Sequence, residues 1–326
     1  MKEFAYRRAT AVHDALTSVA EAGTKFLAGG TNLVDLMKRG VETPARLIDV
    51  RALPLNGISE APNGDLVIGA TTTNSETAAH PEIRRRYPAL SQAVLAGASG
   101  QLRNMATTAG NLLQRTRCAY FADLASACNK RVPGSGCAAL EGEHHNHAVL
   151  GTSPSCVATN PSDMAVALML FDAVVRYETL TGQGEIPIAR FFQPVGDNPH
   201  IETALPAGAL ITSVALPHKE GGRSRYRKVR ERASYAFATV SVAADLTVAL
   251  GRVSDVRIAL GGVASHPWRA TIAEERLLGG PATPEVFRAA AEAELAAATP
   301  LPHNGYKVTL ARNLVQAVLT DLTRAE

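Results

Sequence analysis

Residues 25–33 read KFLAGGTNL, a succession that predicts a strand, a glycine turn and a helix. We expect the strand over Lys25–Ala28 and the helix over Asn32–Arg39, with Gly29 and Gly30 between them. Paired glycines let the backbone approach a bulky anion closely, and the free N–H groups at the start of the helix suit a pyrophosphate. The segment is neither the dinucleotide fingerprint G-x-G-x-x-G nor a P-loop, so a plain strand-to-helix turn is the commoner explanation of this motif alone.

Around this turn the sequence predicts an α+β chain in three parts. The length of 326 residues suggests two or three domains, at roughly 100–200 residues each. Residues 1–57 form a small α/β unit, and residues 58–220 form a larger mixed region. Gly221-Gly222, inside the polar stretch HKEGGRSR, marks the start of a separate C-terminal domain over 221–326.

The hydrophobic pattern assigns elements to each part. In the first part it adds a strand at Arg46–Val50. In the middle region we expect a strand at Leu66–Thr73, a helix through Glu76–Ala96, an amphipathic helix from Ser162 and a hairpin around Thr181–Gly184. In the C-terminal domain we expect a strand at Tyr226–Arg230, a helix at Phe237–Ala244, strands at Leu246–Leu250 and Val256–Gly261, and helices to the end.

Composition argues against several classes of function. With 46% apolar and 19% charged residues, the chain is an ordinary soluble globular protein. The net charge of +3 and the aromatic content of 5% give no support for nucleic-acid binding. No apolar run approaches the roughly 20 residues that span a bilayer, and the N-terminal residues contain no apolar signal core. We therefore expect no membrane insertion and, from this chain alone, a cytoplasmic location.

Two further segments favour an anion-binding interpretation. Ser99–Leu112 reads SGQLRNMATTAGNL, and its small residues at Thr107–Gly110 allow backbone contact with phosphate or ribityl oxygens. Asn160–Met164 reads NPSDM, where Ser162 fits an N-cap and Asp163 the first turn of a helix. Each segment has a simple structural explanation by itself, but the three together indicate a cofactor site.

The motifs resemble those of one known family over essentially the whole chain. The segments are AGGTNL at 28–33, LRNMATTAGNL at 102–112, PSDM at 161–164, LITSVALP at 210–217 and YRKVRERASYAFATVSVA at 226–243. Together they resemble the FAD-binding (middle) subunit of the xanthine oxidase family of molybdenum hydroxylases. The resemblance implies a two-part FAD-binding domain of the PCMH type, with a small α/β subdomain and a larger mixed subdomain, followed by a C-terminal α+β domain.

The resemblance also implies which residues contact the FAD. Those around the pyrophosphate are Phe26, Leu27, Ala28, Gly29, Gly30, Thr31, Asn32 and Leu33. Those near the phosphates and the ribityl chain are Thr107, Thr108, Gly110 and Asn111, with further contacts from Ser162 and Asp163. Ile211 and Lys228 are implied near the isoalloxazine ring, where a cation favours the reduced, anionic flavin. On the residues alone, Lys228 is better explained as part of a solvated basic cluster with Arg225, Arg227 and Arg230.

All four cysteines lie between residues 118 and 156, with the spacing C-x9-C-x8-C-x18-C. This spacing matches neither a zinc-finger pair nor the ferredoxin run. The basic neighbours Arg115, Arg117, Lys130 and Arg131 suit a negatively charged cluster, and so long an irregular loop needs something to tie it down. On the residues alone, a metal site, two disulfides and four unrelated thiols all stay open. The cysteines are Cys118, Cys128, Cys137 and Cys156.

The sequence around the cysteines adds a closer resemblance. RTRCAYF, CNKRVPGSGCAALEG and HAVLG are most similar to the flavin subunit of bacterial periplasmic aldehyde oxidoreductases. That similarity implies an insertion at about 115–158 in which the four cysteines bind a [4Fe–4S] cluster. Because four cysteines complete such a cluster, we predict that His144, His145 and His147, in EGEHHNH, belong to a solvated surface.

The resemblance implies an electron-transfer role with no catalytic residue in this chain. A large molybdenum-cofactor subunit would oxidise an aldehyde. Electrons would pass through a small [2Fe–2S] subunit to the FAD, and then to oxygen, a quinone or a redox protein rather than NAD. The heterotrimer would reach the periplasm with a signal-bearing partner.

Three alternatives remain on the sequence alone. One is the FAD subunit of another molybdenum hydroxylase, of the xanthine dehydrogenase or hydroxybenzoyl-CoA reductase type. The others are a stand-alone flavin oxidase and a zinc- or disulfide-braced binding protein.

Overall fold

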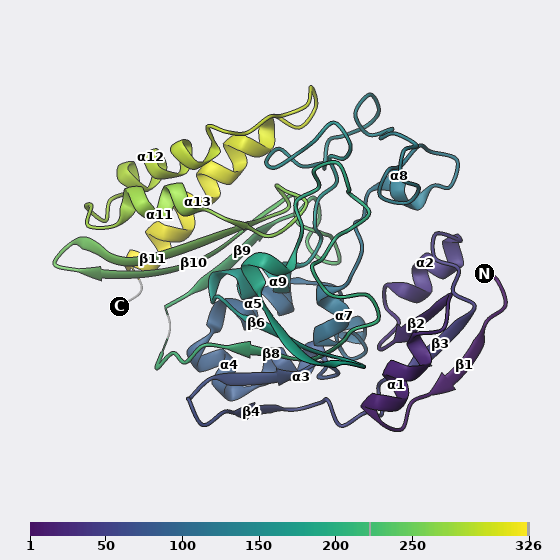
Figure 1. The fold of residues 1–326 in the computed structure, drawn as a ribbon. Coiled ribbons are helices and arrows are strands. Elements are labelled where there is room, and N and C mark those ends of the chain that lie inside the picture. Colours follow the sequence, from purple (N-terminus) through teal and green to yellow (C-terminus); the bar gives the residue numbers. More distant parts are fainter. Residues whose placement is uncertain (222, 325–326) are drawn as a thin grey trace.

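The structure is a computed structural model that describes residues 1–221 and 223–324. Helices and strands gather around three sheets that follow one another along the chain (Figure 1). The predicted α+β class is confirmed. The three sheets fall within the predicted parts 1–57, 58–220 and 221–326, but the boundaries themselves stay predictions. Gly222, which belongs to the predicted boundary, lies outside the described residues.

The N-terminal sheet has three parallel strands in the order β1-β3-β2. Parallel strands need crossover connections, and a helix lies in each one. The elements are β1 (Ala5–Arg8), α1 (Val12–Val19), β2 (Thr24–Leu27), α2 (Leu33–Arg39) and β3 (Arg46–Asp49). The predicted strands at 25–28 and 46–50 and the helix at 32–39 are confirmed to within one residue at each end, whereas β1 and α1 are absent from the predictions.

The middle sheet has five antiparallel strands in the order β4-β5-β8-β6-β7. The predicted hairpin is confirmed, and the strand predicted at 66–73 ends earlier, at residue 69. The strands are β4 (Ile58–Glu60), β5 (Leu66–Gly69), β6 (Val174–Thr179), β7 (Gly182–Pro187) and β8 (Leu210–Leu216), and α10 (Ile188–Phe191) follows β7.

Three short helices take the place of the single helix predicted through Glu76–Ala96, so that prediction is wrong. Pro81 and Pro88 each begin a new helix, because proline suits the first position of a helix and cannot continue a preceding one. The helices are α3 (Asn74–Ala79), α4 (Pro81–Arg86) and α5 (Pro88–Ala96), followed by α6 (Gly100–Arg103) and α7 (Thr108–Leu112).

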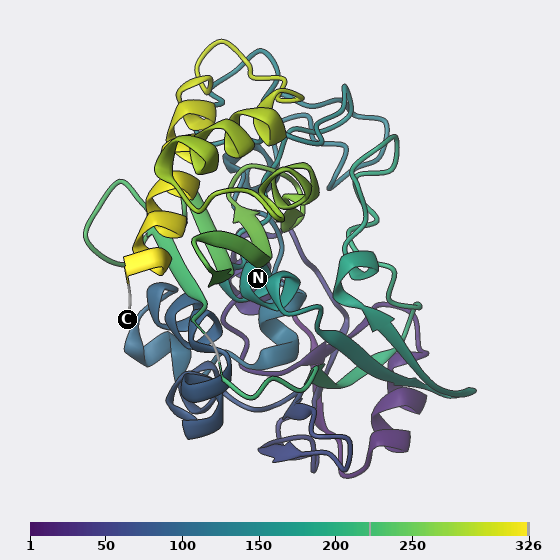
Figure 2. The same ribbon diagram turned by 90° about the vertical axis from the view of Figure 1, so that its left-hand side faces the viewer.

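The C-terminal sheet has four antiparallel strands in the order β12-β11-β10-β9, and three helices pack on it (Figures 1 and 2). The elements are β9 (Arg225–Val229), β10 (Val240–Ala249), β11 (Arg252–Gly261), β12 (Trp268–Arg269), α11 (Thr271–Leu277), α12 (Pro284–Leu295) and α13 (Tyr306–Arg324). The helix predicted at Phe237–Ala244 is wrong, because β10 occupies most of that range. Residues 240–246 are all buried, so the run lacks the alternation that identifies a strand.

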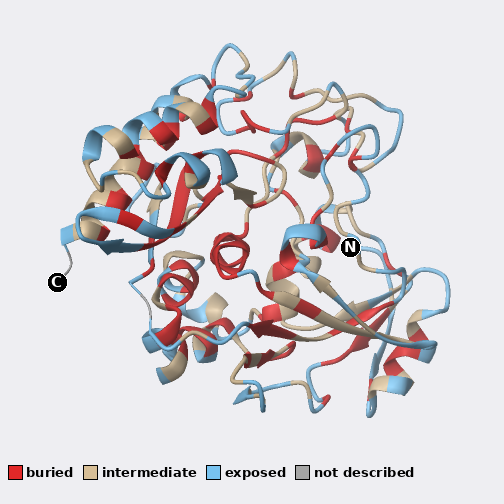
Figure 3. Cartoon of the chain, turned by 60° about the vertical axis from the view of Figure 1, so that its left-hand side comes forward, coloured by how far each residue is buried: buried red, intermediate tan, exposed pale blue. Residues whose placement is uncertain are grey.

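Helix α9 (Asp163–Leu170) begins after the predicted N-cap Ser162, but it is not amphipathic. All of its residues are buried, because it contacts α5 as well as β10 and β11. Buried helix is drawn red near the centre of Figure 3. The helix therefore connects the middle part of the chain to the C-terminal part.

The cysteine-rich stretch is a long irregular loop, as predicted, with one short helix, α8 (Ala119–Ala122). Its later residues Val149 and Leu150 are fully buried in the core of the C-terminal part, and their N–H groups donate to the carbonyl of Val263. The loop is thus anchored to the C-terminal part. Within residues 1–221 and 223–324, no helix has the length and apolar content needed to cross a bilayer.

Candidate functional site

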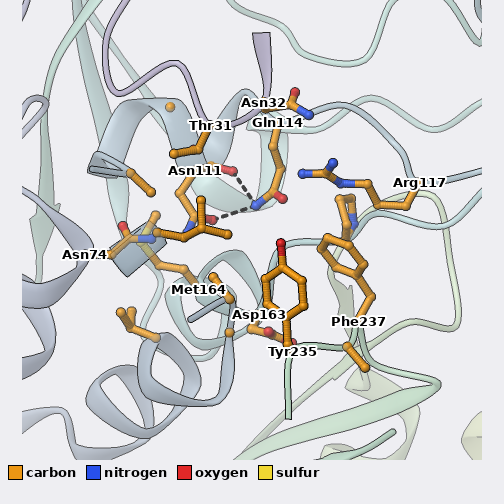
Figure 4. A pocket seen from close by; sticks show the side chains of 18 of the residues that line it. Thr31, Asn32, Asn74, Asn111, Gln114, Arg117, Asp163, Met164, Tyr235 and Phe237 are labelled. Carbon is orange, nitrogen blue, oxygen red and sulfur yellow. Dashed lines mark hydrogen bonds between the residues drawn. The ribbon is translucent and has the colours of Figure 1, made fainter. Parts of the chain in front are cut away.

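A cleft of about 490 Å³ lies where segments of all three parts of the chain meet. The N-terminal part contributes the turn between β2 and α2. The middle part contributes α3, α5, α6, α7 and the start of α9, and the C-terminal part contributes residues 232–237. Figure 4 shows the amides of Asn32, Asn111 and Gln114 near one another, with the aromatic rings of Tyr235 and Phe237 across the cleft. A few polar groups beside aromatic surface are typical of a small-molecule site.

The glycine turn packs tightly against the second predicted segment. A Cβ atom on Gly29 would lie 1.8 Å from the carbonyl oxygen of Met105, so only glycine fits there. Gly30 has a φ of +72°, in the left-handed region that favours glycine. Thr31 follows the two glycines, Ala106 follows Met105, and both line the cleft. The structure thus brings the first two predicted segments together.

Two amide side chains at the cleft each have one buried atom without a hydrogen-bond partner. Asn32 Oδ1 accepts from the backbone N–H of Arg115 at 2.9 Å, which leaves Asn32 Nδ2 buried and unpartnered. Asn74, at the start of α3, is 4% exposed, and its Oδ1 also has no partner. Because an unsatisfied buried polar atom costs about 1–3 kcal/mol, both amides indicate a polar ligand. Asn74 is missing from the predictions, since a polar residue at a helix start looks like an ordinary cap.

A hydrogen-bonded group of three side chains forms another part of the wall. Asn111 Oδ1 accepts from Ser162 Oγ at 2.6 Å and from Gln114 Nε2 at 2.9 Å. Ser162 also caps α9 by accepting from the N–H of Ala165 at 2.9 Å. Asn111 and Gln114 line the cleft, whereas Ser162 does not line it and is hydrogen-bonded to Asn111. The amide group of Asn111 is therefore fixed in orientation.

Asp163 lines the cleft and belongs to a buried polar network. Its Oδ2 accepts from Lys228 Nζ at 2.7 Å, and its Oδ1 accepts from the Tyr226 hydroxyl at 2.5 Å. Burial raises the pKa of Asp163, and the Lys228 ammonium acts in the opposite direction. Burial also raises the pKa of Tyr226 well above its usual value. Lys228 is not in a solvated cluster, because its side chain is only 3% exposed, and it reaches the cleft through Asp163.

The remaining predicted contacts support the cleft from outside or lie away from it. Thr107 accepts from the N–H of Gly110 at 3.3 Å, and Thr108 Oγ1 donates to the carbonyl of Thr72 at 3.1 Å. Ile211 is 2% exposed in the core of the middle part and is not brought to the cleft. The predicted residues that line the cleft are Thr31, Asn32, Gly110, Asn111 and Asp163. Those that do not are Phe26, Leu27, Ala28, Gly29, Gly30, Leu33, Thr107, Thr108, Ser162, Ile211 and Lys228.

An aromatic wall, missing from the predictions, comes from the segment between β9 and β10. Tyr235 has a φ of +53°, a strained backbone conformation of the kind that clusters at functional sites. Figure 4 shows its ring pointing into the cleft. The guanidinium of Arg117 lies 4.7 Å from the centre of the Phe237 ring, a cation–π contact. The only sequence feature that indicates this wall is SYAF, which places two aromatic residues, both exposed in the structure, after a basic strand.

The four cysteines converge on a second pocket. All four line it, together with Phe121 and Lys130, and all four are free thiols. Cys128 and Cys137 pair through their backbones in an isolated bridge. The pocket has a volume of about 10 Å³, which is room for one water molecule. The predicted ligand residues are thus brought together, and they form no disulfide.

The sulfur atoms lie in a buried, donor-rich environment. Cys156 Sγ accepts from the N–H of Ala158 at 3.4 Å, and Cys118 Sγ lies 3.2 Å from His147 Nε2. Burial raises the pKa of the Cys118 thiol to about 11. That thiol therefore stays protonated at neutral pH unless a metal displaces the proton. Over the described ranges, no three His, Cys, Asp or Glu side chains gather closely enough to hold a single metal ion.

Two of the three histidines predicted at the surface are buried, so that prediction is wrong for them. His144 is 3% exposed and His147 is 8% exposed, whereas His145 is exposed as predicted. The reason is long-range packing, because the chain before α13 covers this part of the loop. His144 Nε2 accepts from the N–H of His303 at 3.1 Å, and the two rings stack at 4.8 Å. Burial lowers the pKa of His147 to about 4, so its ring is neutral at pH 7.

Comparison with known proteins shows similarity over nearly the whole chain. Residues 2–219 match the FAD binding domain in molybdopterin dehydrogenase, and residues 224–322 match the CO dehydrogenase flavoprotein C-terminal domain. The chain is 52% identical over 325 residues to the aldehyde oxidoreductase FAD-binding subunit PaoB of Escherichia coli strain K12, covering 98% of each chain. It is 28% identical to the carbon monoxide dehydrogenase medium chain of Hydrogenophaga pseudoflava, covering 97% of this chain and 96% of that one.

Solved structures agree with these matches. A structure of carbon monoxide dehydrogenase from Hydrogenophaga pseudoflava superposes with a TM-score of 0.76 at 25% identity, covering 98% of this chain and 96% of that chain. Quinoline 2-oxidoreductase from Pseudomonas putida 86 has the same fold, with a TM-score of 0.77 at 22% identity over 99% of both chains. The family resemblance inferred from the sequence is confirmed. The chain therefore belongs to the family of FAD-binding subunits of molybdenum hydroxylases, a family of oxidoreductases.

Proposed function

We propose that this chain binds FAD in the cleft and transfers electrons within an aldehyde-oxidising molybdenum hydroxylase. A large molybdenum-cofactor subunit and a small [2Fe–2S] subunit complete the heterotrimer and supply the electrons. The external acceptor is oxygen, a quinone or a redox protein rather than NAD. The observation that carries the proposal is the pair of unpartnered amides, Asn32 and Asn74, beside a glycine turn that belongs to an FAD-binding family.

The amides and the turn fit the polar part of a dinucleotide. Phosphate oxygens only accept hydrogen bonds, so the Nδ2 donor of Asn32 suits the pyrophosphate. The free Oδ1 acceptor of Asn74 suits a hydroxyl of the ribityl chain or the ribose. Gly29 and Gly30 shape the turn that places Thr31 and Asn32 at the cleft. When bound, FAD supplies the redox chemistry that amino-acid side chains lack, while these residues bind and orient it.

A stand-alone flavin oxidase receives less support from the cleft. Such an enzyme needs a base that can reach a substrate. The carboxylates among the described lining residues are Asp35 and Asp163. Asp163 already accepts from Lys228 and Tyr226, and Asp35 is paired with Arg39 and Arg117. Substrate oxidation on a partner subunit is therefore the better explanation, and the identity to an aldehyde oxidoreductase subunit favours an aldehyde as the substrate.

We further propose that the cysteine pocket holds a [4Fe–4S] cluster, with Cys118, Cys128, Cys137 and Cys156 as its ligands. The support is that all four are free and line one pocket. The ligands of a zinc ion all approach it to about 2.3 Å, whereas each thiolate of a four-iron cluster binds a different iron. The choice of a four-iron cluster over zinc rests on the resemblance of the cysteine segments to those of the flavin subunit of aldehyde oxidoreductases. The pocket of about 10 Å³ is too small for a four-iron cluster, so binding would require the loop to widen.

An ultraviolet–visible spectrum of the purified complex, with flavin and iron analysis of this subunit, tests both proposals. We expect flavin bands over a broad iron–sulfur absorption that dithionite bleaches. Flavin without iron in this subunit would overturn the cluster and leave the FAD. A subunit with neither chromophore would overturn both and favour a zinc- or disulfide-braced binding protein.

We also propose that the complex resides in the periplasm, exported in folded form with a signal-bearing partner. The support is the similarity of the cysteine segments to periplasmic aldehyde oxidoreductases. Fractionation of cells that produce all subunits tests this. Recovery of the assembled complex in the cytoplasmic fraction would contradict it.

A further inference from the structure

The imidazole of His147 contacts one of the four cysteines from outside their pocket. His147 Nε2 lies 3.2 Å from Cys118 Sγ. The cysteine pocket is lined by all four cysteines but not by His147. The ring is only 8% exposed and packs against Tyr120, with the ring centres 6.2 Å apart. The histidine therefore contacts the sulfur atom of Cys118 and does not line the space between the four sulfur atoms.

The chemistry of the two groups sets the direction of this hydrogen bond once Cys118 binds a metal. A metal-bound thiolate has no proton, so its sulfur can only accept. At 3.2 Å from a sulfur that can only accept, Nε2 of His147 must carry an N–H. Nδ1 of His147 is buried and has no hydrogen-bond partner. Cys118 Sγ is thus the polar partner that selects the tautomer.

The backbone of His147 is held in place by the C-terminal part of the chain. Its N–H donates to the carbonyl of His144 at 3.0 Å. Its carbonyl accepts from Lys307 Nζ at 2.9 Å and from Asn304 Nδ2 at 3.3 Å. Lys307 and Asn304 are both fully buried. The position of His147 is therefore set by packing against the C-terminal part of the chain.

We propose that His147 is a positioning residue that donates Nε2–H to the Cys118 thiolate and raises the reduction potential of the cluster. The inference rests on the proposed function, because it presupposes the [4Fe–4S] cluster. Reduction adds negative charge to the cluster, and part of that charge resides on the sulfurs. A hydrogen bond to sulfur is therefore stronger in the reduced state, which favours reduction.

Three substitutions of His147 in the complete complex separate this role from its rivals. His147→Phe keeps a ring but removes the donor. His147→Gln places an amide N–H at the position of Nε2, the same number of bonds from Cα, whereas His147→Asn places one nearer Nδ1. His145→Phe, on the exposed side of the same loop, is the matched control. The readouts are the iron and sulfide content of this subunit and the midpoint potential of its cluster, from a reductive titration followed by electron paramagnetic resonance.

We expect all four variants to keep the cluster. His147→Phe and His147→Asn shift the midpoint potential to more negative values, His147→Gln restores it toward that of the unsubstituted protein, and His145→Phe leaves it unchanged. A potential that does not move in His147→Phe overturns the hydrogen bond. Iron loss in His147→Phe and His147→Gln alike, with iron retained in Cys118→Ser, overturns the assignment in favour of His147 as a ligand. An unsubstituted subunit without an iron–sulfur signal overturns the cluster itself, which is a separate result.

Discussion

Arg117 and Cys118 are neighbours in the chain, yet they face two different sites. Arg117 lines the cleft proposed for FAD, and Cys118 lines the cysteine pocket. Thr116 fixes the turn between them, because its Oγ1 donates to the carbonyl of Thr159 at 2.9 Å and accepts from the N–H of Cys118 at 3.3 Å. One peptide bond thus connects two sites with separate sets of side chains. The two proposed cofactors should therefore bind independently although they lie close together.

Cys128→Ser tests that independence. Cys128 lines only the cysteine pocket, so we expect the variant to lose its cluster while its FAD content stays close to that of the unsubstituted protein. Iron analysis and the fluorescence of heat-released flavin measure the two quantities. Simultaneous loss of flavin would show that the loop needs the cluster in order to form the wall of the cleft.

Asn32→Asp is the reciprocal test. The change replaces the unpartnered Nδ2 donor with a carboxylate oxygen, which would face the pyrophosphate. We expect a loss of FAD affinity of about tenfold to a thousandfold, or about 1.4–4 kcal/mol, measured by titrating the apoprotein with FAD. Iron content should stay unchanged. Asn198→Asp, at an exposed position away from the cleft, is the control and should bind FAD normally. Equal affinities in both variants would rule out a phosphate contact at Asn32.

The glycine turn between β2 and α2 is the part of this region that the sequence predicts well. Gly29 and Gly30 are informative because close approach and a positive φ demand glycine whatever lies nearby. By contrast, Asn74 and Tyr235 reach the cleft only because distant segments fold together, and the sequence around Asn74 looks like an ordinary helix cap. The burial of His147 is a similar case, since its carbonyl partner Lys307 lies 160 residues away.

The secondary-structure prediction is wrong at two places, for different reasons. Pro81 and Pro88 divide a run whose apolar pattern continues across them. The first half of β10 is buried throughout, and a continuous apolar run looks the same in a buried strand and in a buried helix. The surrounding helices α9 and α13 decide the outcome, and their packing cannot be inferred from the run itself.

Lys228→Met should destabilise the fold strongly. The substitution leaves the buried Asp163 carboxylate without its cation, and breaking such a pair typically costs about 3–5 kcal/mol. Denaturant unfolding of Lys228→Met, Asp163→Asn and the double variant measures the coupling. We expect the double variant to lose clearly less stability than the sum of the single changes, because neither charge is then left alone. Additive losses would mean that the pair is not formed.

Asp49 should make stability depend on pH in the acidic range. Burial acts to raise its pKa, but hydrogen bonds from Arg51 and Tyr6 outweigh burial and hold the pKa at about 2, below the ordinary 3.8. A carboxyl group with a lowered pKa contributes stability that is fully present above about pH 4 and is lost as the pH falls through 4 to 2. The expected contribution is about 2 kcal/mol. Asp49→Asn should remove that share of the acid dependence, measured as the free energy of unfolding between pH 5 and pH 2, and an unchanged slope would contradict the assignment.

Gly29→Ala should weaken both the fold and the cleft. A methyl group at this position would lie 1.8 Å from the carbonyl oxygen of Met105, and backbone atoms on both sides must move apart to admit it. Overpacking of this kind costs about 1–3 kcal/mol, and here it also pushes the turn before α2 away from Ala106 at the cleft wall.

Gly100→Ala is the matched control, because nothing lies within 4 Å of a Cβ atom there and the residue sits in α6. We expect Gly100→Ala to leave FAD affinity unchanged and stability equal or slightly higher, since alanine favours a helix. Gly29→Ala should lower the melting temperature and the FAD affinity together. A Gly29→Ala variant that binds FAD as tightly as Gly100→Ala would show that the turn can move without affecting the cofactor, and that the tight contact with Met105 serves folding alone.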